Sequence, residues 1–121
     1  MDLSTMPKKY SLVYKKDFDN LFKKGHRLHS QHFTLVCDTA PSLKVAFVAP
    51  KKHIKKATDR NYAKRITREI TRKQLTALLT RTPTYHLAVM IKVNLRDLVQ
   101  KNGFEAVQNE LTGLLSRLRK P

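Results

Sequence analysis

A helical segment with charge of almost one sign limits most strongly what this chain can fold into. Residues 51–73 include ten lysines and arginines but only two acidic residues, Asp59 and Glu69. Helical spacing of the apolar residues runs over 58–79, with Thr58 as the expected N-cap and Asp59 beside the positive end of the helix. The fold must bury one side of this helix and leave its charged side open.

The two faces of this segment separate when its residues are placed at about 100° intervals around the helix axis. The apolar face consists of Ala63, Ile66, Ile70 and Ala77. The opposite face consists of Arg60, Asn61, Lys64, Arg65, Arg68 and Arg72. An ordinary solvated face mixes both signs through pairs four residues apart, whereas this one is nearly all cationic. Because like charges this close destabilise the free protein, the pattern indicates a face that binds phosphate groups.

The whole chain shares this excess of positive charge. Its 121 residues carry 25 Lys and Arg against 9 Asp and Glu, a formal net charge of +16. Such a surplus indicates a polyanionic partner, of which nucleic acid is the first candidate and an acidic membrane surface the second. Apolar runs such as 87–91 are too short to span a bilayer, and the N-terminus lacks the apolar region of a signal peptide. We therefore expect a soluble, cytoplasmic protein.

Length and composition are typical of one globular domain over 1–121, with 1–7 as a flexible leader. Cys37 is the single cysteine, which excludes an intrachain disulfide framework and a multi-cysteine zinc site. We therefore expect one compact core without disulfide cross-links.

The segment before the basic helix predicts a short helix and two strands. The spacing of two phenylalanines and a leucine predicts a helix over 15–24, which Gly25 is placed to end. Residues 32–38 alternate as a half-buried strand does, and a Pro-containing turn leads into a second strand over 44–49. We expect these two strands to form an antiparallel pair.

The segment after the basic helix predicts one strand and one helix. Thr82 and Pro83 should stop the basic helix, and the nearly continuous apolar run over 85–93 is typical of a central strand covered on both faces. Asn102 and Glu105 resemble a capping box at the start of a helix that continues to the C-terminus. This order of elements predicts the α+β class.

Two stretches carry a specific motif. Residues 44–69 read KVAFVAPKKHIKKATDRNYAKRITRE, in which a strand leads into a Lys-Lys pair and then an Arg-Asn step followed by Lys-Arg and a further Arg. Residues 17–25 read DFDNLFKKG, a short aromatic helix. Both stretches resemble the bacterial ribonuclease P protein family. Two positions depart from the family pattern: Tyr62 stands where Arg is common, which removes one cation, and Ala46 stands where Gly is common.

The resemblance implies a fold and separate roles for the protein and an RNA subunit. The fold would be a single-domain α-β sandwich, with a mostly antiparallel sheet of about four strands, three helices and a left-handed βαβ crossover through the basic helix. A catalytic RNA subunit with its Mg²⁺ ions would remove the 5′ leader of precursor tRNA, and the protein would bind both RNAs as a monomer in a one-to-one complex. The contacts with the RNA subunit would come from Arg60, Asn61, Lys64, Arg65, Arg68 and Arg72.

The resemblance also implies that the protein holds the single-stranded leader in a cleft between the sheet and a helix. Candidate stacking platforms are Phe18, Phe22 and Phe33, because aromatic rings stack on unpaired bases of any identity. The alternative for each ring is that it fills the core. A cationic rim would come from Lys51, Lys52, Lys55 and Lys56, whose alternative role is that of an exposed loop.

The sequence offers no evident constellation for protein-based nuclease chemistry. Such chemistry needs paired carboxylates that hold metal, or a positioned acid and base, and the nine acidic residues are scattered. The spacing of His26, His29 and His32 suggests a metal site, but the segment enters a strand, so the rings are not expected to converge. We expect no catalytic residue, metal site or organic cofactor in the protein, and magnesium held mainly by RNA.

Two other classes of function remain open from the sequence. The first is a noncatalytic RNA-binding structural protein, such as a ribosomal component or an RNA chaperone. The second is a module that binds DNA or an acidic membrane. The arrangement of Arg60-Asn61 and Lys64-Arg65, together with the aromatic helix, favours the ribonuclease P subunit over the noncatalytic RNA-binding protein.

Overall fold

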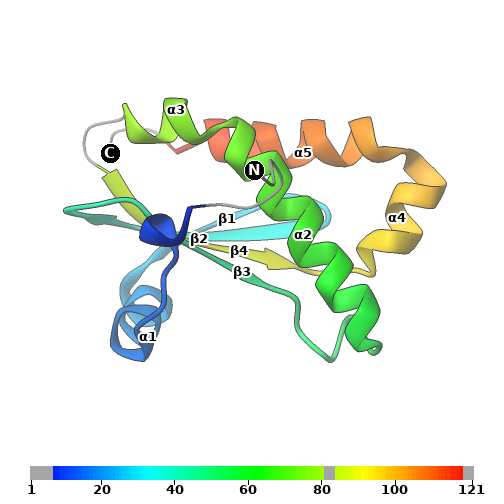
Figure 1. The fold of residues 1–121 in the computed structure, drawn as a ribbon, viewed down its shortest axis with the longest axis horizontal. Helices are drawn as coiled ribbons and strands as arrows, with labels where there is room; N and C mark the ends of the chain where they lie inside the picture. Colours follow the sequence, from blue (N-terminus) through cyan, green and yellow to red (C-terminus); the bar gives the residue numbers. More distant parts are fainter. Residues whose placement is uncertain (1–6, 81–83, 119–121) are drawn as a thin grey trace.

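A four-stranded β-sheet separates the helices into two layers (Figure 1). The computed structural model describes residues 7–80 and 84–118. Helix α1 lies on one face of the sheet, and helices α2 to α5 lie on the other. In chain order the elements are a 3₁₀ helix (Lys8–Tyr10), α1 (Lys15–Lys24), β1 (His26–His29), β2 (Phe33–Ala40), β3 (Lys44–Val48), α2 (Ala57–Lys73), α3 (Leu75–Leu79), β4 (Thr84–Ile91), α4 (Leu95–Asn102) and α5 (Phe104–Ser116).

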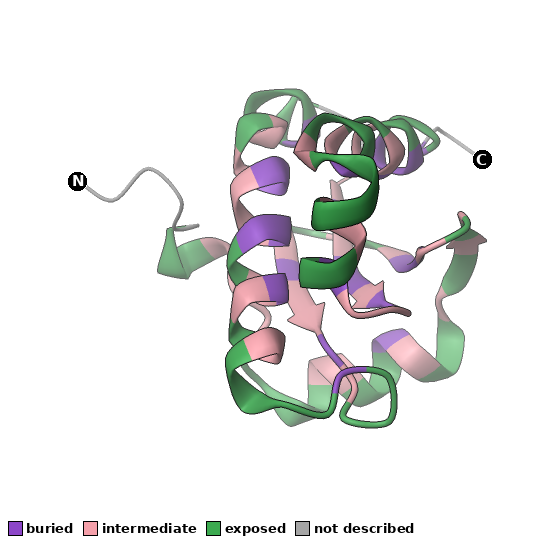
Figure 2. Ribbon diagram, turned by 90° about the vertical axis from the view of Figure 1, so that its right-hand side faces the viewer, coloured by how far each residue is buried: buried purple, intermediate pink, exposed green. Residues whose placement is uncertain are grey.

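Because both faces of the sheet are covered, the protein has two cores. The larger core lies between the sheet and helices α2, α4 and α5, and it includes the fully buried Phe33 and Leu35. The smaller core lies under α1 and is built from Leu21, Val36 and Ala88. Phe33, Leu35 and Cys37 of β2 therefore face the larger core, and Val36 faces the smaller one. Figure 2 shows the buried segments in the interior and the exposed turns at the periphery.

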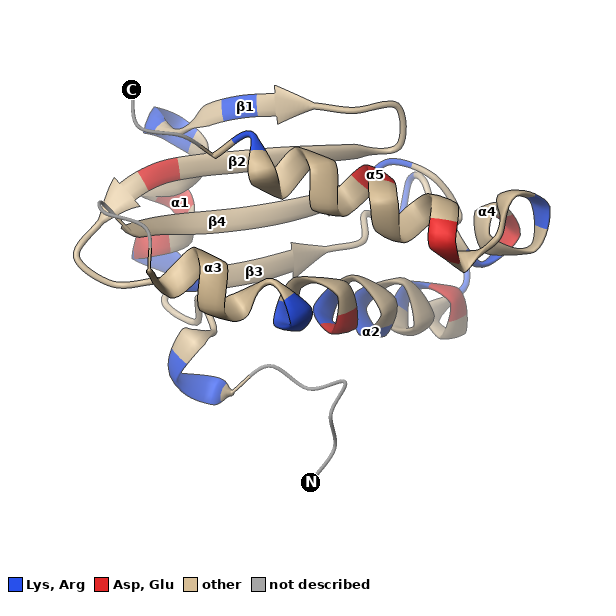
Figure 3. Ribbon diagram, turned by 90° about the horizontal axis from the view of Figure 1, so that it is seen from above, with Lys and Arg blue, Asp and Glu red and all other residues tan. Residues whose placement is uncertain are grey.

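The strands lie in the order β1-β2-β4-β3, so the central position predicted for the strand over 85–93 is confirmed. β4 is antiparallel to β2 and parallel to β3. A parallel pair needs a crossover connection, which α2 and α3 provide here. Seen from the side of these helices with β3 and β4 running upward, β4 lies to the left of β3 (Figure 3). The crossover is therefore left-handed, as the resemblance implies.

The antiparallel pairing expected between 32–38 and 44–49 is wrong. β2 pairs with β1 on one side and with β4 on the other, and β3 lies at the opposite edge of the sheet. The reason is that the most apolar strand, β4, takes the position between them, where both its faces and both its edges are covered. β1 was not identified as a strand because its sequence, HRLH, carries one apolar residue and stays mostly exposed.

The boundaries of the basic helix also differ from the expectation. Lys56 keeps an extended backbone and is the N-cap of α2, so Thr58 lies inside the first turn instead of capping it. α2 ends at Lys73, and Gln74 (φ −96°, ψ 4°) separates it from the short helix α3. The change of direction at this break leaves Ala77 exposed, so its predicted place on the buried face is wrong.

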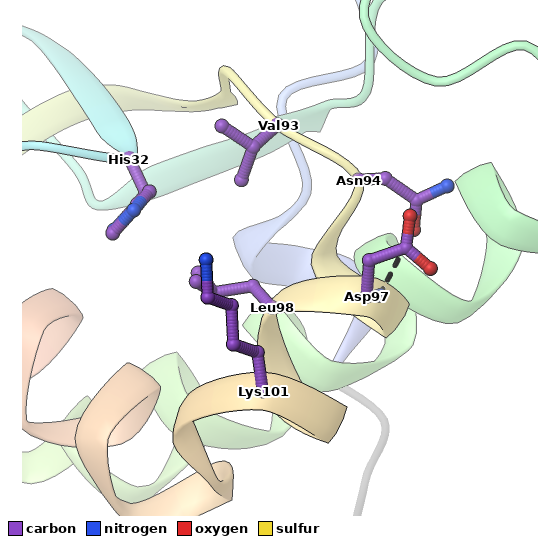
Figure 4. Close-up of a pocket in the computed structure, with 6 residues that line it drawn as sticks. All are labelled: His32, Val93, Asn94, Asp97, Leu98 and Lys101. Atoms are coloured by element: carbon purple, nitrogen blue, oxygen red, sulfur yellow. Dashed lines mark hydrogen bonds between the residues drawn. The ribbon is translucent and has the colours of Figure 1, made fainter.

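The predicted C-terminal helix is preceded by a helix that the pattern did not reveal. Asn94 caps this first helix, α4, because its side-chain oxygen accepts a hydrogen bond from the backbone N–H of Asp97 at 3.2 Å (Figure 4). Gly103, with φ +89°, then turns the chain and is itself the N-cap of α5. Asn102 and Glu105 therefore form no capping box. The described residues contain five α-helices where three were expected.

The helix predicted over 15–24 is confirmed, and Gly25 ends it for a reason of space. Its φ of −71° is open to any residue, so no left-handed conformation requires glycine here. A Cβ atom at Gly25 would instead lie 2.5 Å from the carbonyl oxygen of Leu21 and 2.9 Å from a methyl carbon of Val36. Glycine therefore allows the end of α1 to approach β2 closely.

Some expectations lie outside the described residues. These are the flexible leader, apart from Pro7, and the stop at Thr82 and Pro83. Within 7–80 and 84–118, no helix combines the length and the apolar character that a membrane crossing requires.

Candidate nucleic-acid interface

Helix α2 buries the side that its apolar residues predict. Ala63 and Ile70 have no exposed surface, Ile66 retains 8%, and all three pack in the larger core. Thr67 and Thr71 are buried on the same side. The hydroxyl of Thr67 donates to the carbonyl oxygen of Ala63 at 2.9 Å, which satisfies this polar group inside the core. The core therefore fixes one face of the helix along its length.

The opposite side of α2 carries cations that no carboxylate pairs with. Among residues 7–80 and 84–118, the ion pairs are Lys15–Asp19, His32–Glu110 and Arg96–Asp59, and none includes a lysine or arginine of α2. Figure 3 shows the basic positions following one another along this helix. On this side Asn61 and Arg65 are exposed, and Arg60, Lys64, Arg68 and Arg72 are half-buried. Unneutralised charges so close together repel one another and attract a polyanion.

Two aromatic rings orient arginines on this face. The guanidinium carbon of Arg65 lies 5.6 Å from the ring centroid of Tyr62, and that of Arg68 lies 5.8 Å from the ring centroid of Phe47. At such distances a cation is attracted to the negative face of the ring. The rings therefore hold the guanidinium groups in place without using their N–H donors.

The connection between β3 and α2 extends the cationic surface. Ile54 is fully buried and anchors this connection in the larger core. Arg60 donates from Nη1 to the carbonyl oxygens of Ile54 at 3.0 Å and Lys55 at 2.8 Å. Arg60 thus fastens the loop to the first turn of α2, a structural role in addition to its predicted contact with RNA. Lys51, Lys52, Lys55 and Lys56 are all exposed.

A groove of about 370 Å³ lies where the N-terminal segment, β3 and α2 meet. The N-terminal segment runs beside β3, and the N–H of Leu12 donates to the carbonyl oxygen of Val45 at 3.0 Å. The groove is lined by Lys8, Ser11, Leu12, Val45, Ala46, Phe47 and Arg68. It combines two cationic side chains with an aromatic ring, which are the components of sites for single-stranded nucleic acid.

Helix α1 presents two neighbouring aromatic rings beside the smaller core. The ring centroids of Phe18 and Phe22 are 4.6 Å apart, and both residues are half-buried. Phe22 packs against the smaller core and lies 5.9 Å from the guanidinium of Arg27. Leu12 and Ala46 pack against the same core and also line the groove. An apolar surface therefore connects the rings of α1 with the groove.

The chain is similar in sequence to a known protein family. The sequence model of the family described as Ribonuclease P matches residues 6–119. The chain belongs to the ribonuclease P protein family. It is 32% identical over 108 residues to the ribonuclease P protein component of Aliivibrio salmonicida, covering 88% of each chain. It is 28% identical to the ribonuclease P protein component of a Nitratiruptor species, covering 91% of this chain and 93% of the relative.

A solved structure extends the likeness from sequence to fold. The ribonuclease P protein from Thermotoga maritima is 26% identical and superposes with a TM-score of 0.76, covering 91% of this chain and 98% of that protein. The α+β fold implied by the resemblance is therefore confirmed as the fold of the ribonuclease P protein family.

One predicted leader-binding residue is buried instead. Phe33 opens β2, has no exposed surface and packs in the larger core. The prediction that its ring stacks on leader bases is therefore wrong. Alternation along 32–38 shows which side chains share a face of the strand, but only the packing of α5 on β2 decides that this face is covered.

The three closely spaced histidines have separate surroundings. Nδ1 of His29 lies 3.1 Å from the hydroxyl of Thr34, whereas His32 contacts Glu110. His26 lines a different pocket, beside the end of α5. Within the described part of the chain, no three His, Cys, Asp or Glu side chains are grouped so that they could hold a metal ion.

Glu110 joins α5 to the β1–β2 hairpin. Its carboxylate accepts hydrogen bonds from the hydroxyl of Ser30 at 2.6 Å and from the backbone N–H of His32 at 2.8 Å, and it lies 2.7 Å from Nδ1 of His32. Burial by itself would raise the pKa of Glu110, but these hydrogen bonds outweigh it, so the pKa lies below its ordinary value. This carboxylate serves the fold.

Two residues that contact the side chains of α2 were not identified from the sequence. Phe47 belongs to a predicted strand, and only the edge position of β3 brings its ring to the groove. Arg96 lies on α4, which was not predicted. The signal that would have found α4 is Asn94 followed three residues later by Asp97, the spacing of an N-cap and an acidic residue in the first turn.

Proposed function

We propose that this ribonuclease P protein binds the catalytic RNA subunit of ribonuclease P through the outer face of α2. The observation that carries the proposal is a row of cations that, among the described residues, have no carboxylate partners, on a helix whose other side is fixed by the core. An RNA backbone supplies the missing anions, and guanidinium groups bind phosphate oxygens through charge-assisted hydrogen bonds. The contacting residues would be Arg60, Asn61, Lys64, Arg65, Arg68 and Arg72.

The 5′ leader of precursor tRNA would bind on the neighbouring surface. Phe18 and Phe22 would stack on unpaired bases, and the groove beside β3 would continue this path toward α2. Stacking tolerates any base, which suits a protein that must accept many precursors. The exposed lysines of the β3–α2 connection, Lys51, Lys52, Lys55 and Lys56, would attract the leader backbone.

In this proposal the cleavage chemistry belongs to the RNA subunit. Magnesium held by RNA phosphates would activate water and stabilise charge at the scissile phosphate. The protein would hold the RNA subunit and orient the leader, as a monomer in a one-to-one complex in the cytoplasm. The product would be a mature tRNA 5′ end.

Reconstitution tests the proposal. Protein added to ribonuclease P RNA should increase cleavage of precursor tRNA at a magnesium concentration too low for the RNA alone. The holoenzyme should also bind precursor tRNA more tightly than mature tRNA, because only the precursor carries a leader. A noncatalytic RNA-binding protein would retain both RNAs without selective enhancement of cleavage, and that result would refute the proposal.

A further inference from the structure

Helix α4 meets the first turn of α2 through a cluster of polar side chains. Asn94 donates from Nδ2 to one carboxylate oxygen of Asp59 at 3.1 Å, and Arg96 donates from Nε to the other at 2.9 Å. The hydrogen bond from Asn94, together with the contact with Arg96, holds the pKa of Asp59 below its ordinary value. Asp59 therefore stays ionised near neutral pH and fixes Arg96 beside α2.

Arg96 also covers a ring that α2 presents. Its guanidinium carbon lies 4.4 Å from the ring centroid of Tyr62, and the guanidinium carbon of Arg65 lies 5.6 Å from the same centroid. The side chain of Arg96 keeps 45% of its surface exposed. Its two terminal nitrogens form no hydrogen bond with another residue in 7–80 or 84–118. One ring thus holds two guanidinium groups, one from each helix.

This arrangement is incomplete without an anion. In the described part of the chain, Asp59 pairs with Arg96 and also accepts from Asn94, whereas the guanidinium of Arg65 has no carboxylate partner. Two cations against one ring repel each other. A phosphodiester group bound by both would reduce this repulsion and accept hydrogen bonds from their N–H groups, since the guanidinium fork matches phosphate oxygens.

We propose that Arg96, Tyr62 and Arg65 form a clamp in which the two guanidinium groups, held by one ring, bind one RNA phosphodiester. The clamp extends the interface from α2 onto α4. It rests on the proposed function in that its ligand is RNA, and the phosphate comes either from the ribonuclease P RNA or from precursor tRNA. The competing explanation is that Arg96 is only a brace, which ties α4 to α2 through Asp59.

The first test compares Arg96→Ala with Lys101→Ala. Lys101 is exposed on the same helix outside the cluster, so its replacement removes the same charge. Binding of ribonuclease P RNA is measured over a series of salt concentrations at fixed magnesium. Arg96→Ala should weaken binding on the order of tenfold and reduce the slope of log affinity against log salt by roughly 0.7 to 0.9. Equal effects of the two variants would show that only net charge matters and would overturn the clamp.

A further variant separates the clamp from the brace. Asp59→Asn removes the carboxylate charge but keeps a side-chain oxygen that can accept from Nε of Arg96, so both guanidinium groups stay in place and the clamp requires unchanged or tighter RNA binding. If Asp59→Asn reproduces the loss seen for Arg96→Ala, Arg96 is a brace.

Two binding experiments identify the source of the phosphate. One measures assembly of the protein with ribonuclease P RNA alone, and the other measures binding of precursor tRNA to the preassembled holoenzyme. A loss for Arg96→Ala in the first places the RNA subunit in the clamp, and a loss in the second places the substrate there. Unchanged affinity in both overturns the proposal.

Thermal melts establish that each variant folds, and Arg96→Gln carries the same test if Arg96→Ala does not fold. A wild-type protein that binds neither RNA would refute the proposed function itself. Failure of the clamp alone would instead appear as a wild-type protein that binds RNA and an Arg96→Ala variant that binds it equally well.

Discussion

The joint between α5 and the β1–β2 hairpin and the outer face of α2 use charge in opposite ways. At the joint, Glu110 accepts hydrogen bonds from Ser30 and His32, and Lys92 donates to the carbonyl oxygen of Ser30 at 2.9 Å. On α2, within the part of the chain that the structure describes, no lysine or arginine pairs with a carboxylate. Charges bonded inside the protein stabilise the fold, whereas unpaired charges of one sign oppose folding and remain free for a partner.

The aromatic residues show the same contrast. Phe33, directly after His32 at the joint, is fully buried, whereas Phe18 on α1 is half-buried and, among the described residues, has its ring contact with Phe22. Among the described residues, Phe33 therefore serves stability, whereas the partly exposed ring of Phe18 is a candidate for contact with RNA.

Replacing Phe33 with Ala should have the largest effect on the stability of the protein. Removal of a fully buried ring leaves a cavity and should lower the free energy of unfolding by about 3 to 5 kcal/mol. Urea unfolding of the purified protein measures this change. A loss below about 1 kcal/mol would show that the joint is loosely packed. The contrast between a joint that stabilises the fold and an α2 face that does not would then fail.

Arg65→Ala and Arg68→Ala should weaken RNA binding and change the stability of the protein little. Each should weaken assembly with ribonuclease P RNA by about 1 to 3 kcal/mol if its contact is a charge-assisted hydrogen bond. The free energy of unfolding should change by less than about 1 kcal/mol, since each variant loses one partly exposed cation–π contact. Filter binding and urea unfolding of the same preparations test both statements. Unchanged RNA affinity at physiological salt would remove these residues from the interface.

Glu110→Gln should reduce stability by about 1 to 2 kcal/mol near neutral pH and leave RNA affinity unchanged, because the lost charge-assisted bonds lie at the joint. The pKa of Glu110 is lowered from 4.5 by folding, so its contribution to stability is present above pH 4.5 and is lost as the pH falls through the lower, folded value. Unfolding measured from about pH 7 to about pH 3 should therefore show the wild type and the variant converging at low pH. A constant difference across this range would contradict the assignment.

Phe18→Ala should have the smallest effect on folding, under about 1 kcal/mol, because its ring is only partly buried. It should nevertheless reduce the preference of the holoenzyme for precursor over mature tRNA. Precursor and mature tRNA affinities measured side by side test this, with Phe22→Ala for comparison. Loss of the cooperative melt with Phe18→Ala would show that this ring belongs to the core.

The motif over 44–69 was sufficient to predict the family. Helical periodicity also placed Ala63, Ile66 and Ile70 correctly on the buried side of α2. A regular helix with one side in the core has apolar residues at helical spacing, and this spacing is visible in the sequence. The wrong N-cap at Thr58 and the missed α4 arose because helix ends depend on a few local bonds, which many sequences can satisfy.

Strand pairing and the burial of individual rings could not be predicted in the same way. The neighbours of β2 and β3 are set by where β4 buries most surface, a competition among segments far apart in sequence. Phe33 and Phe22 have the same chemistry, and their different burial depends on whether α5 or solvent covers the adjoining face.

The sequence by itself determined that one helix must have an apolar side and a cationic side, since both properties follow from residue type and the fixed geometry of the helix. Only the tertiary structure decided which charges find partners. Asp59 is engaged by Asn94 and Arg96 from α4, and Glu110 by Ser30 and His32 from the hairpin. Ion pairs form across distances of a few ångströms that are set by packing of remote segments, and no local pattern in the chain encodes those distances.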